Sequence, residues 1–254
     1  MTVVLLVRRE SPIKHFSGAQ AVAWILYLGG AIGVLTTLFN NFAYGLISIS
    51  AILALGLLGQ SVSGLLVDQF GLMGMPRHPF HLRKLAGIAL VAAGIIIMID
   101  SIVLIPMLLS FSAGICVVVS RTLNAKLAAK SSVYTSTFIN YVVGLCVSTL
   151  ALLLLGQSEL AAGFSLSTNP WIYFGGLLGA SVVLICNIAV PRVPAFYLTL
   201  LMFAGQVFSA VIFDMFIRGE FIPLIAIGGL LVTAGLIVDL LIDRKYRPQD
   251  LPGH

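Results

Sequence analysis

The sequence predicts an all-α polytopic membrane protein with eight transmembrane helices arranged as two inverted-topology repeats. Three observations lead to this fold class: an apolar composition, long unbroken apolar stretches, and a second half that repeats the first. Of the 254 residues, 59% are hydrophobic and 9% are charged, whereas soluble domains carry about 25% charged residues. This composition excludes a soluble globular domain, a disordered chain and a disulfide scaffold.

Each apolar stretch is long enough to cross a bilayer core, which needs about 20 helical residues. Strands of a membrane barrel are excluded because they are about ten residues long and alternate in polarity. Backbone polar groups in lipid must be satisfied within the segment, so the stretches are helices. The expected spans are residues 22–40, 45–67, 84–100, 102–120, 133–156, 171–190, 195–217 and 222–242.

The basic residues fall on one side of the predicted membrane. When the connections are assigned alternately to the two sides, Arg218 alone of the 14 Lys and Arg residues lies opposite the N-terminus. The positive-inside rule makes the basic side the cytoplasm. We therefore predict a multi-pass membrane protein with both termini cytoplasmic, whose partners include membrane lipids and not nucleic acid.

The chain contains an internal repeat at a shift of 146 residues. Residues 24–68 and 170–214 align without gaps and share 12 identities in 45 positions, where chance gives roughly four or five. Five helices separate equivalent positions, and because five is odd the two copies are inverted. The identical pairs are Tyr27/Tyr173, Gly29/Gly175, Gly30/Gly176, Gly33/Gly179, Leu38/Leu184, Asn41/Asn187, Ala43/Ala189, Leu55/Leu201, Gly59/Gly205, Gln60/Gln206, Ser63/Ser209 and Asp68/Asp214.

The two repeats are expected to differ in completeness. The first occupies residues 1–101 with three helices, and the second occupies 102–254 with five helices and a cytoplasmic tail. At the same shift, residues 1–10 fall on 147–156, which is the end of a predicted helix. We therefore expect the first two helices of the first repeat to be missing from this chain, through a late start, a truncation or the loss of a hairpin.

Several motifs give the chain a family resemblance. Gly59-Gln60 lies in an apolar helix that leads to Asp68-Gln69-Phe70-Gly71, and the basic segment Arg83-Lys84-Leu85-Ala86-Gly87 follows. Gly205-Gln206 and Asp214-Met215-Phe216 repeat the first part, and Arg121-Thr122-Leu123-Asn124-Ala125-Lys126-Leu127 is a further match. Over residues 20–245 the chain resembles the YdcZ-type family of the drug/metabolite transporter superfamily. The resemblance implies two inverted five-helix halves and transport of small metabolites across a bacterial inner membrane, with no particular substrate.

The function expected from these observations is secondary transport of a small metabolite or drug-like molecule by alternating access. A non-transporting membrane subunit or scaffold that needs a partner to complete its fold is the alternative. An enzyme is not expected, because no paired acids or metal motif lies at membrane depth, and no cofactor or metal site is expected. No carboxylate and no arginine is expected at mid-membrane, which favours a neutral or zwitterionic substrate. A homodimer is left open.

Polar side chains inside the predicted spans are the candidate substrate pathway, because such groups are costly in lipid unless they face protein or water. Gln60 with Ser63, and Gln206 with Ser209, share a helix face at the same place in each repeat. Hydrogen bonding between helices is the alternative explanation for them. The full pathway set is Gln60, Ser63, Gln206, Ser209, Ser112, Cys116 and Asn140.

Polar residues near helix ends are candidate gates. Asn41 and Asn187 end equivalent helices, where capping or a turn is the alternative role. Asp68 and Asp214 end the following helices at opposite faces, and the alternative for them is pairing with local bases or backbone.

Overall fold

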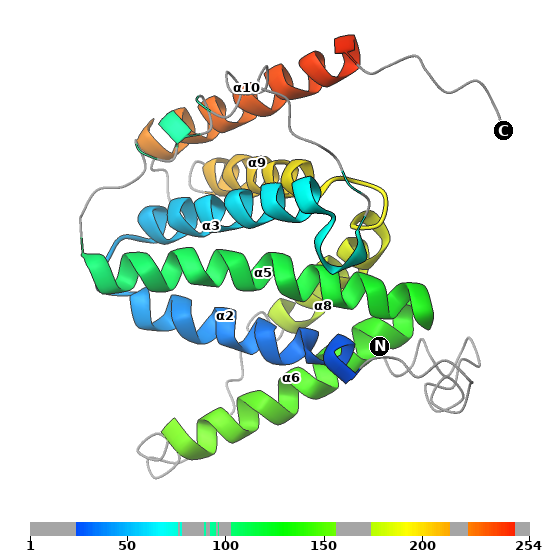
Figure 1. The fold of residues 1–254 in the computed structure, drawn as a ribbon. Helices are drawn as coiled ribbons and strands as arrows, with labels where there is room; N and C mark the ends of the chain where they lie inside the picture. The colour runs from blue at the N-terminus through cyan, green and yellow to red at the C-terminus, as the bar shows by residue number, and fades with distance from the viewer. Residues whose placement is uncertain are drawn as a thin grey trace, which may run out of the picture. The chain divides into compact units, whose positions relative to one another are not determined.

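In the part of the chain that the structure describes, every regular element is helical. The computed structural model describes residues 24–75, 77, 89, 92–94, 96, 103–155, 174–213 and 223–246 (Figure 1). An isolated β-bridge between Tyr44 and Ile47 closes a turn. The helices are η2 Trp24–Leu28, α2 Gly29–Ala43, α3 Ile49–Phe70, η3 Leu72–Gly74, α5 Leu104–Lys130, α6 Val133–Leu155, α8 Phe174–Ala189, α9 Ala195–Phe213 and α10 Pro223–Tyr246.

Helix length and composition agree with a membrane protein. Among the described residues, four segments are long and apolar enough to cross a membrane: Trp24–Ala43, Ala51–Phe70, Leu104–Lys130 and Val133–Leu154. Shorter apolar helices cover Phe174–Ala189 and Ala195–Gln206. The predicted all-helical membrane class is confirmed, whereas the count of eight spans and their inverted arrangement remain predictions. Most of the predicted span 84–100 lies outside the described residues.

The helix from Leu104 differs from its prediction in length. The expected end was residue 120, but α5 continues to Lys130. The added residues include Leu, Ala and Lys, which have high helix propensity. The helix therefore continues through the polar residues that were expected to end it. The break comes at Ser131 and Ser132, where the Ser132 hydroxyl accepts a hydrogen bond from the Thr135 amide at 3.1 Å and caps α6.

The ends of equivalent helices follow the repeat. α2 ends at Ala43 and α8 at Ala189, while α3 begins at Ile49 and α9 at Ala195. Both pairs of positions are separated by the same shift of 146 residues that aligns the sequences. The boundaries therefore support the repeat as a unit of local structure.

The chain divides into two compact units that do not coincide with the predicted repeats. Unit 1 comprises residues 1–38 and 116–193, and unit 2 comprises 39–115 and 194–254. In the described part of unit 1, α6 packs against α8 and η2. In unit 2, α9 packs against both α3 and α10, as the blue-cyan, gold and orange helices of Figure 1 show. Each unit thus combines segments from both predicted repeats, and the repeat boundaries remain a sequence prediction.

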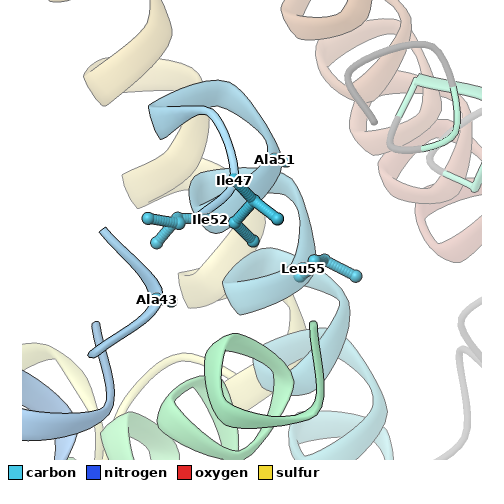
Figure 2. Close-up of a cluster of buried hydrophobic side chains, with 5 residues drawn as sticks. All are labelled: Ala43, Ile47, Ala51, Ile52 and Leu55. Carbon is cyan, nitrogen blue, oxygen red and sulfur yellow. The ribbon is translucent and has the colours of Figure 1, made fainter. Parts of the chain in front are cut away.

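The turn from α2 into α3 is anchored by a hydrophobic cluster in unit 2. Figure 2 shows its five buried members, Ala43, Ile47, Ala51, Ile52 and Leu55. The chain reverses at Gly45, whose φ of 86° lies in the left-handed region that favours glycine. Ser48 then caps α3 by accepting a hydrogen bond from the Ala51 amide at 3.1 Å. Both the start and the direction of α3 are therefore fixed locally.

Small residues let α3 and α5 approach closely within unit 2. A Cβ atom added at Gly59 would collide with the backbone carbonyl of Phe111, and one added at Gly114 would collide with that of Gly56. Backbones come this close only where side chains are absent, as in the small-residue seams of membrane helices. This contact holds the middle of α3, which carries Gln60, against α5.

Candidate functional site

Gln60 and Gln206 lie near the centres of two packed helices in unit 2. Each glutamine is eleven residues, about 17 Å of helix rise, after the first residue of its helix. α3 has 22 residues, so Gln60 lies at its midpoint. The C-terminal end of α3 contacts the start of α9 at Asp68, which places the two glutamines at similar depth along the pair.

The side chains of the α3 and α9 candidates have different surroundings. Gln60 is half-buried, whereas Gln206 and Ser209 are exposed. Ser63 is buried, and its hydroxyl donates to the carbonyl of Gly59 at 2.6 Å within its own helix. Such bonds satisfy the hydroxyl hydrogen, so Ser63 retains only acceptor capacity for another group.

The remaining pathway candidates come from helices α5 and α6. Ser112 is half-buried and belongs to unit 2 together with the α3 and α9 candidates, whereas Cys116 and Asn140 belong to unit 1. The Oδ1 atom of Asn140 accepts a hydrogen bond from the side-chain Nδ2 of Asn124 at 2.7 Å. Asn140 thus joins α6 to α5, and its role in a pathway remains a prediction.

Asp68, a candidate gate, caps the first turn of α9. Its two carboxylate oxygens accept hydrogen bonds from the backbone amides of Ala195 and Phe196, at 2.9 Å each. The carboxylate is 6% exposed, and it faces the positive end of the α9 dipole. Ser48 caps α3 at the equivalent position of the first repeat, but α9 has Pro194 there, which has no side-chain acceptor. Asp68 supplies the missing acceptor from another helix.

The two asparagines near the ends of α2 and α8 have different surroundings. Asn41 is exposed. Asn187 is 2% exposed and its Nδ2 donates to the hydroxyls of Ser136 and Thr137 on α6, at 3.4 and 3.1 Å. Asn187 therefore joins α8 to α6 through its side chain. Asp214, the remaining candidate gate, lies outside the described residues.

A buried arginine is the main residue that the sequence analysis missed. Arg121 was expected in a cytoplasmic loop, but it lies inside α5, nine residues before the helix ends, and is 8% exposed. Neighbouring polar residues on α5 are also buried, among them Thr122, Asn124 and Ser120, whose hydroxyl donates to the Gly29 carbonyl at 2.8 Å. Two features of the sequence could have predicted that Arg121 lies inside a helix. Residues 121–130 have good helix propensity, and Ser131-Ser132 is the first pair of residues at which the helix would be expected to end.

The described candidate residues offer hydrogen-bonding groups. Within the described residues, no group of three or more His, Cys, Asp and Glu side chains gathers where a metal ion could bind. His78 and His81 lie outside those residues. What remains is a set of neutral polar side chains, one buried carboxylate that serves as a helix cap, and one buried guanidinium.

Comparison with known proteins places the chain in a family. The family model described as "Putative inner membrane exporter, YdcZ" matches residues 1–97 and 105–238. No curated protein matches the chain. The match covers nearly the whole sequence, as the motifs around Gly59-Gln60 predicted, and it agrees with the apolar helices described above. The chain therefore belongs to the YdcZ family of inner-membrane transport proteins.

Proposed function

We propose that the protein is a secondary transporter that exports a small metabolite from the cytoplasm by alternating access. The family match supports export across the inner membrane, and the repeat of 146 residues supports a mechanism in which two equivalent halves exchange conformations. The proposed substrate is neutral or zwitterionic. The proposed topology is eight spans with both termini in the cytoplasm.

The observation that carries the proposal is the shared position of Gln60 and Gln206. Transporters with inverted repeats bind substrate near the midplane, where the repeats meet. Both glutamines lie near the centres of helices that pack against each other. An amide offers two donors and an acceptor, which suits polar groups of a neutral or zwitterionic substrate. Gln60 and Gln206 are therefore proposed to bind the substrate during transport.

The experiment compares the metabolites released by cells that overproduce the protein. Wild-type protein, Gln60→Leu, Gln206→Leu and an empty vector are compared by untargeted mass spectrometry of the medium, with expression checked for each. Gln69→Leu is the matched control, because it makes the same change at an exposed position at the end of α3.

We expect at least one metabolite to accumulate in the medium with the wild type and the control variant. Its accumulation should fall to the empty-vector level for both pathway variants, while their expression stays close to wild type. If no metabolite distinguishes wild type from empty vector, the transport proposal fails and the scaffold alternative stands. If export survives both substitutions, the glutamines are structural.

A further inference from the structure

The charged side chains of unit 1 gather in two neighbouring segments. Its described residues, 24–38, 116–155 and 174–193, contain no Asp, Glu or His. All of their basic residues lie in the last ten residues of α5 or in the turn after α8, and these are Arg121, Lys126, Lys130 and Arg192. The rest of the described unit is uncharged, so its positive charge is confined to these two segments.

Hydrogen bonds bring these segments together at the start of α6. The hydroxyl of Ser136, in the first turn of α6, donates to the carbonyl of Asn124 on α5 at 2.6 Å. The Nδ2 atom of Asn187 on α8 donates to the hydroxyls of Ser136 and Thr137, at 3.4 and 3.1 Å. The end of α5, the start of α6 and the end of α8 therefore meet in one polar junction within unit 1.

Three cations border this polar junction. Lys126 and Lys130 are one helical turn apart on one face of α5, and Arg192 follows the end of α8 in a turn closed by its amide on the Ala189 carbonyl, at 2.9 Å. Lys130 and Arg192 are exposed, and Lys126 is half-buried. The first turn of α6 has no acidic residue and is the positive end of its helix dipole. One anionic partner could therefore contact cations from both segments.

The length of α5 places its lysines at the level of the lipid headgroups. The helix has 27 residues and is about 40 Å long, whereas a bilayer core is about 30 Å thick. Its uncharged part, residues 104–120, spans about 26 Å of that core. The core then ends within the next turn, which leaves Lys126 in the headgroup layer and Lys130 at its aqueous edge.

Charge complementarity selects the kind of lipid. A zwitterionic headgroup such as phosphocholine carries its own cation, whereas an anionic headgroup such as phosphoglycerol leaves its phosphate unbalanced. The described residues of unit 1 offer cations and no carboxylate to such a phosphate. The positive-inside rule explains on which side the cations lie, but it is nearly indifferent to acidic residues. The absence of carboxylates among these residues therefore favours an anionic partner.

We propose that the polar junction binds the headgroup of an anionic phospholipid, whose phosphate pairs with Lys126, Lys130 and Arg192. The guanidinium of Arg192 suits two phosphate oxygens, while the lysines act as point charges. The acyl chains find an apolar surface on the last turns of α8, where Ile185 is 60% exposed and Ile188 is 41% exposed. This binding does not depend on whether the protein transports a substrate.

The test measures the melting temperature of the purified full-length chain in a nonionic detergent while phosphatidylglycerol is added. Phosphatidylcholine has the phosphate but no net charge, and inorganic phosphate has the charge but no acyl chains. A ligand that binds the folded state raises the melting temperature with its concentration. We expect phosphatidylglycerol to raise it saturably, with little effect of the other two at equal concentration. At about 1 M salt the rise should shrink, because the charges are screened.

Variants test the three cations directly. Lys126→Gln, Lys130→Gln and Arg192→Gln should each weaken the apparent affinity about fivefold, since a basic residue near an anionic membrane surface contributes about that factor. Lys126→Arg keeps the charge and should keep the affinity. Arg77→Gln is the matched control, because Arg77 is an exposed cation of unit 2 whose Nε donates to the Phe70 carbonyl at 3.2 Å. Its loss should leave the affinity unchanged.

Four results would overturn the inference. No rise with phosphatidylglycerol would exclude the site, and an equal rise with phosphatidylcholine would indicate a general need for lipid. An equal rise with inorganic phosphate would indicate a site for a free anion. Equal weakening by Arg77→Gln and by the three junction variants would indicate attraction to the overall charge of the protein. Because no export is measured, failure of the transport proposal would leave each of these results unchanged.

Discussion

Replacing Asp68 should destabilise the protein more than replacing an ordinary helix cap. The two hydrogen bonds that Asp68 accepts from the first amides of α9 are 2.9 Å long and buried. Hydrogen bonds to charged groups contribute about 1.5–3 kcal/mol each to the free energy of unfolding. Asp68→Ala should therefore cost about 3–6 kcal/mol. Asp68→Asn keeps one acceptor and the side-chain shape, so about half of that loss is expected.

The matched control is Ser48→Ala, which removes the local cap of α3 at the repeat-equivalent position. Its single hydrogen bond, 3.1 Å long and only partly buried, predicts a loss of about 1 kcal/mol. The assay is unfolding of each purified variant by sodium dodecyl sulfate in mixed micelles, followed by circular dichroism. If Asp68→Ala is no more destabilising than Ser48→Ala, the carboxylate does not hold α3 to α9 as we describe.

Three further predictions test topology and packing. With the native cysteines replaced, a cysteine at Tyr44 should react with an impermeant thiol reagent in intact cells and one at Lys130 should not, because the predicted sides differ; the reverse pattern would invert the topology. Gly59→Ala should lower the unfolding free energy by about 1–3 kcal/mol through overpacking, whereas Gly205→Ala, whose added Cβ meets nothing within 4 Å, should be neutral or stabilising; equal losses would refute the seam. Ser120→Ala removes the 2.8 Å bond to α2 and should cost only about 0.6 kcal/mol, so a loss of several kcal/mol in the same assay would contradict this account.

The sequence predicted the helical class and most helix positions because apolar length and polarity are local signals. The ends of α3, α6, α8 and α9 lie within a few residues of their predicted positions where the structure describes them. The end of α5 was placed ten residues too early, because polar residues were taken as the boundary although they are compatible with a helix. Length and periodicity thus predict a helix better than they predict where it ends.

The contacts of the candidate residues could not be predicted in the same way. The partner of Asp68 lies 127 residues away in sequence, and finding it requires knowing that α3 packs on α9. The repeat made Asn41 and Asn187 look equivalent, yet one is exposed and the other is buried against α6. Sequence symmetry therefore predicted equivalent positions, but the neighbours at those positions depend on tertiary packing.

The source of each helix cap bears on the order in which the chain is made. α3 is capped by residues adjacent to it in sequence. Ser48 is its N-cap, and Gly71, in a left-handed conformation, is its C-cap. The first turn of α9 instead uses Asp68, which the ribosome has added more than a hundred residues earlier. The acceptor has thus already been synthesised, as part of α3, when Ala195 and Phe196 are added to the chain. No helix of this pair waits for a cap that has yet to be synthesised.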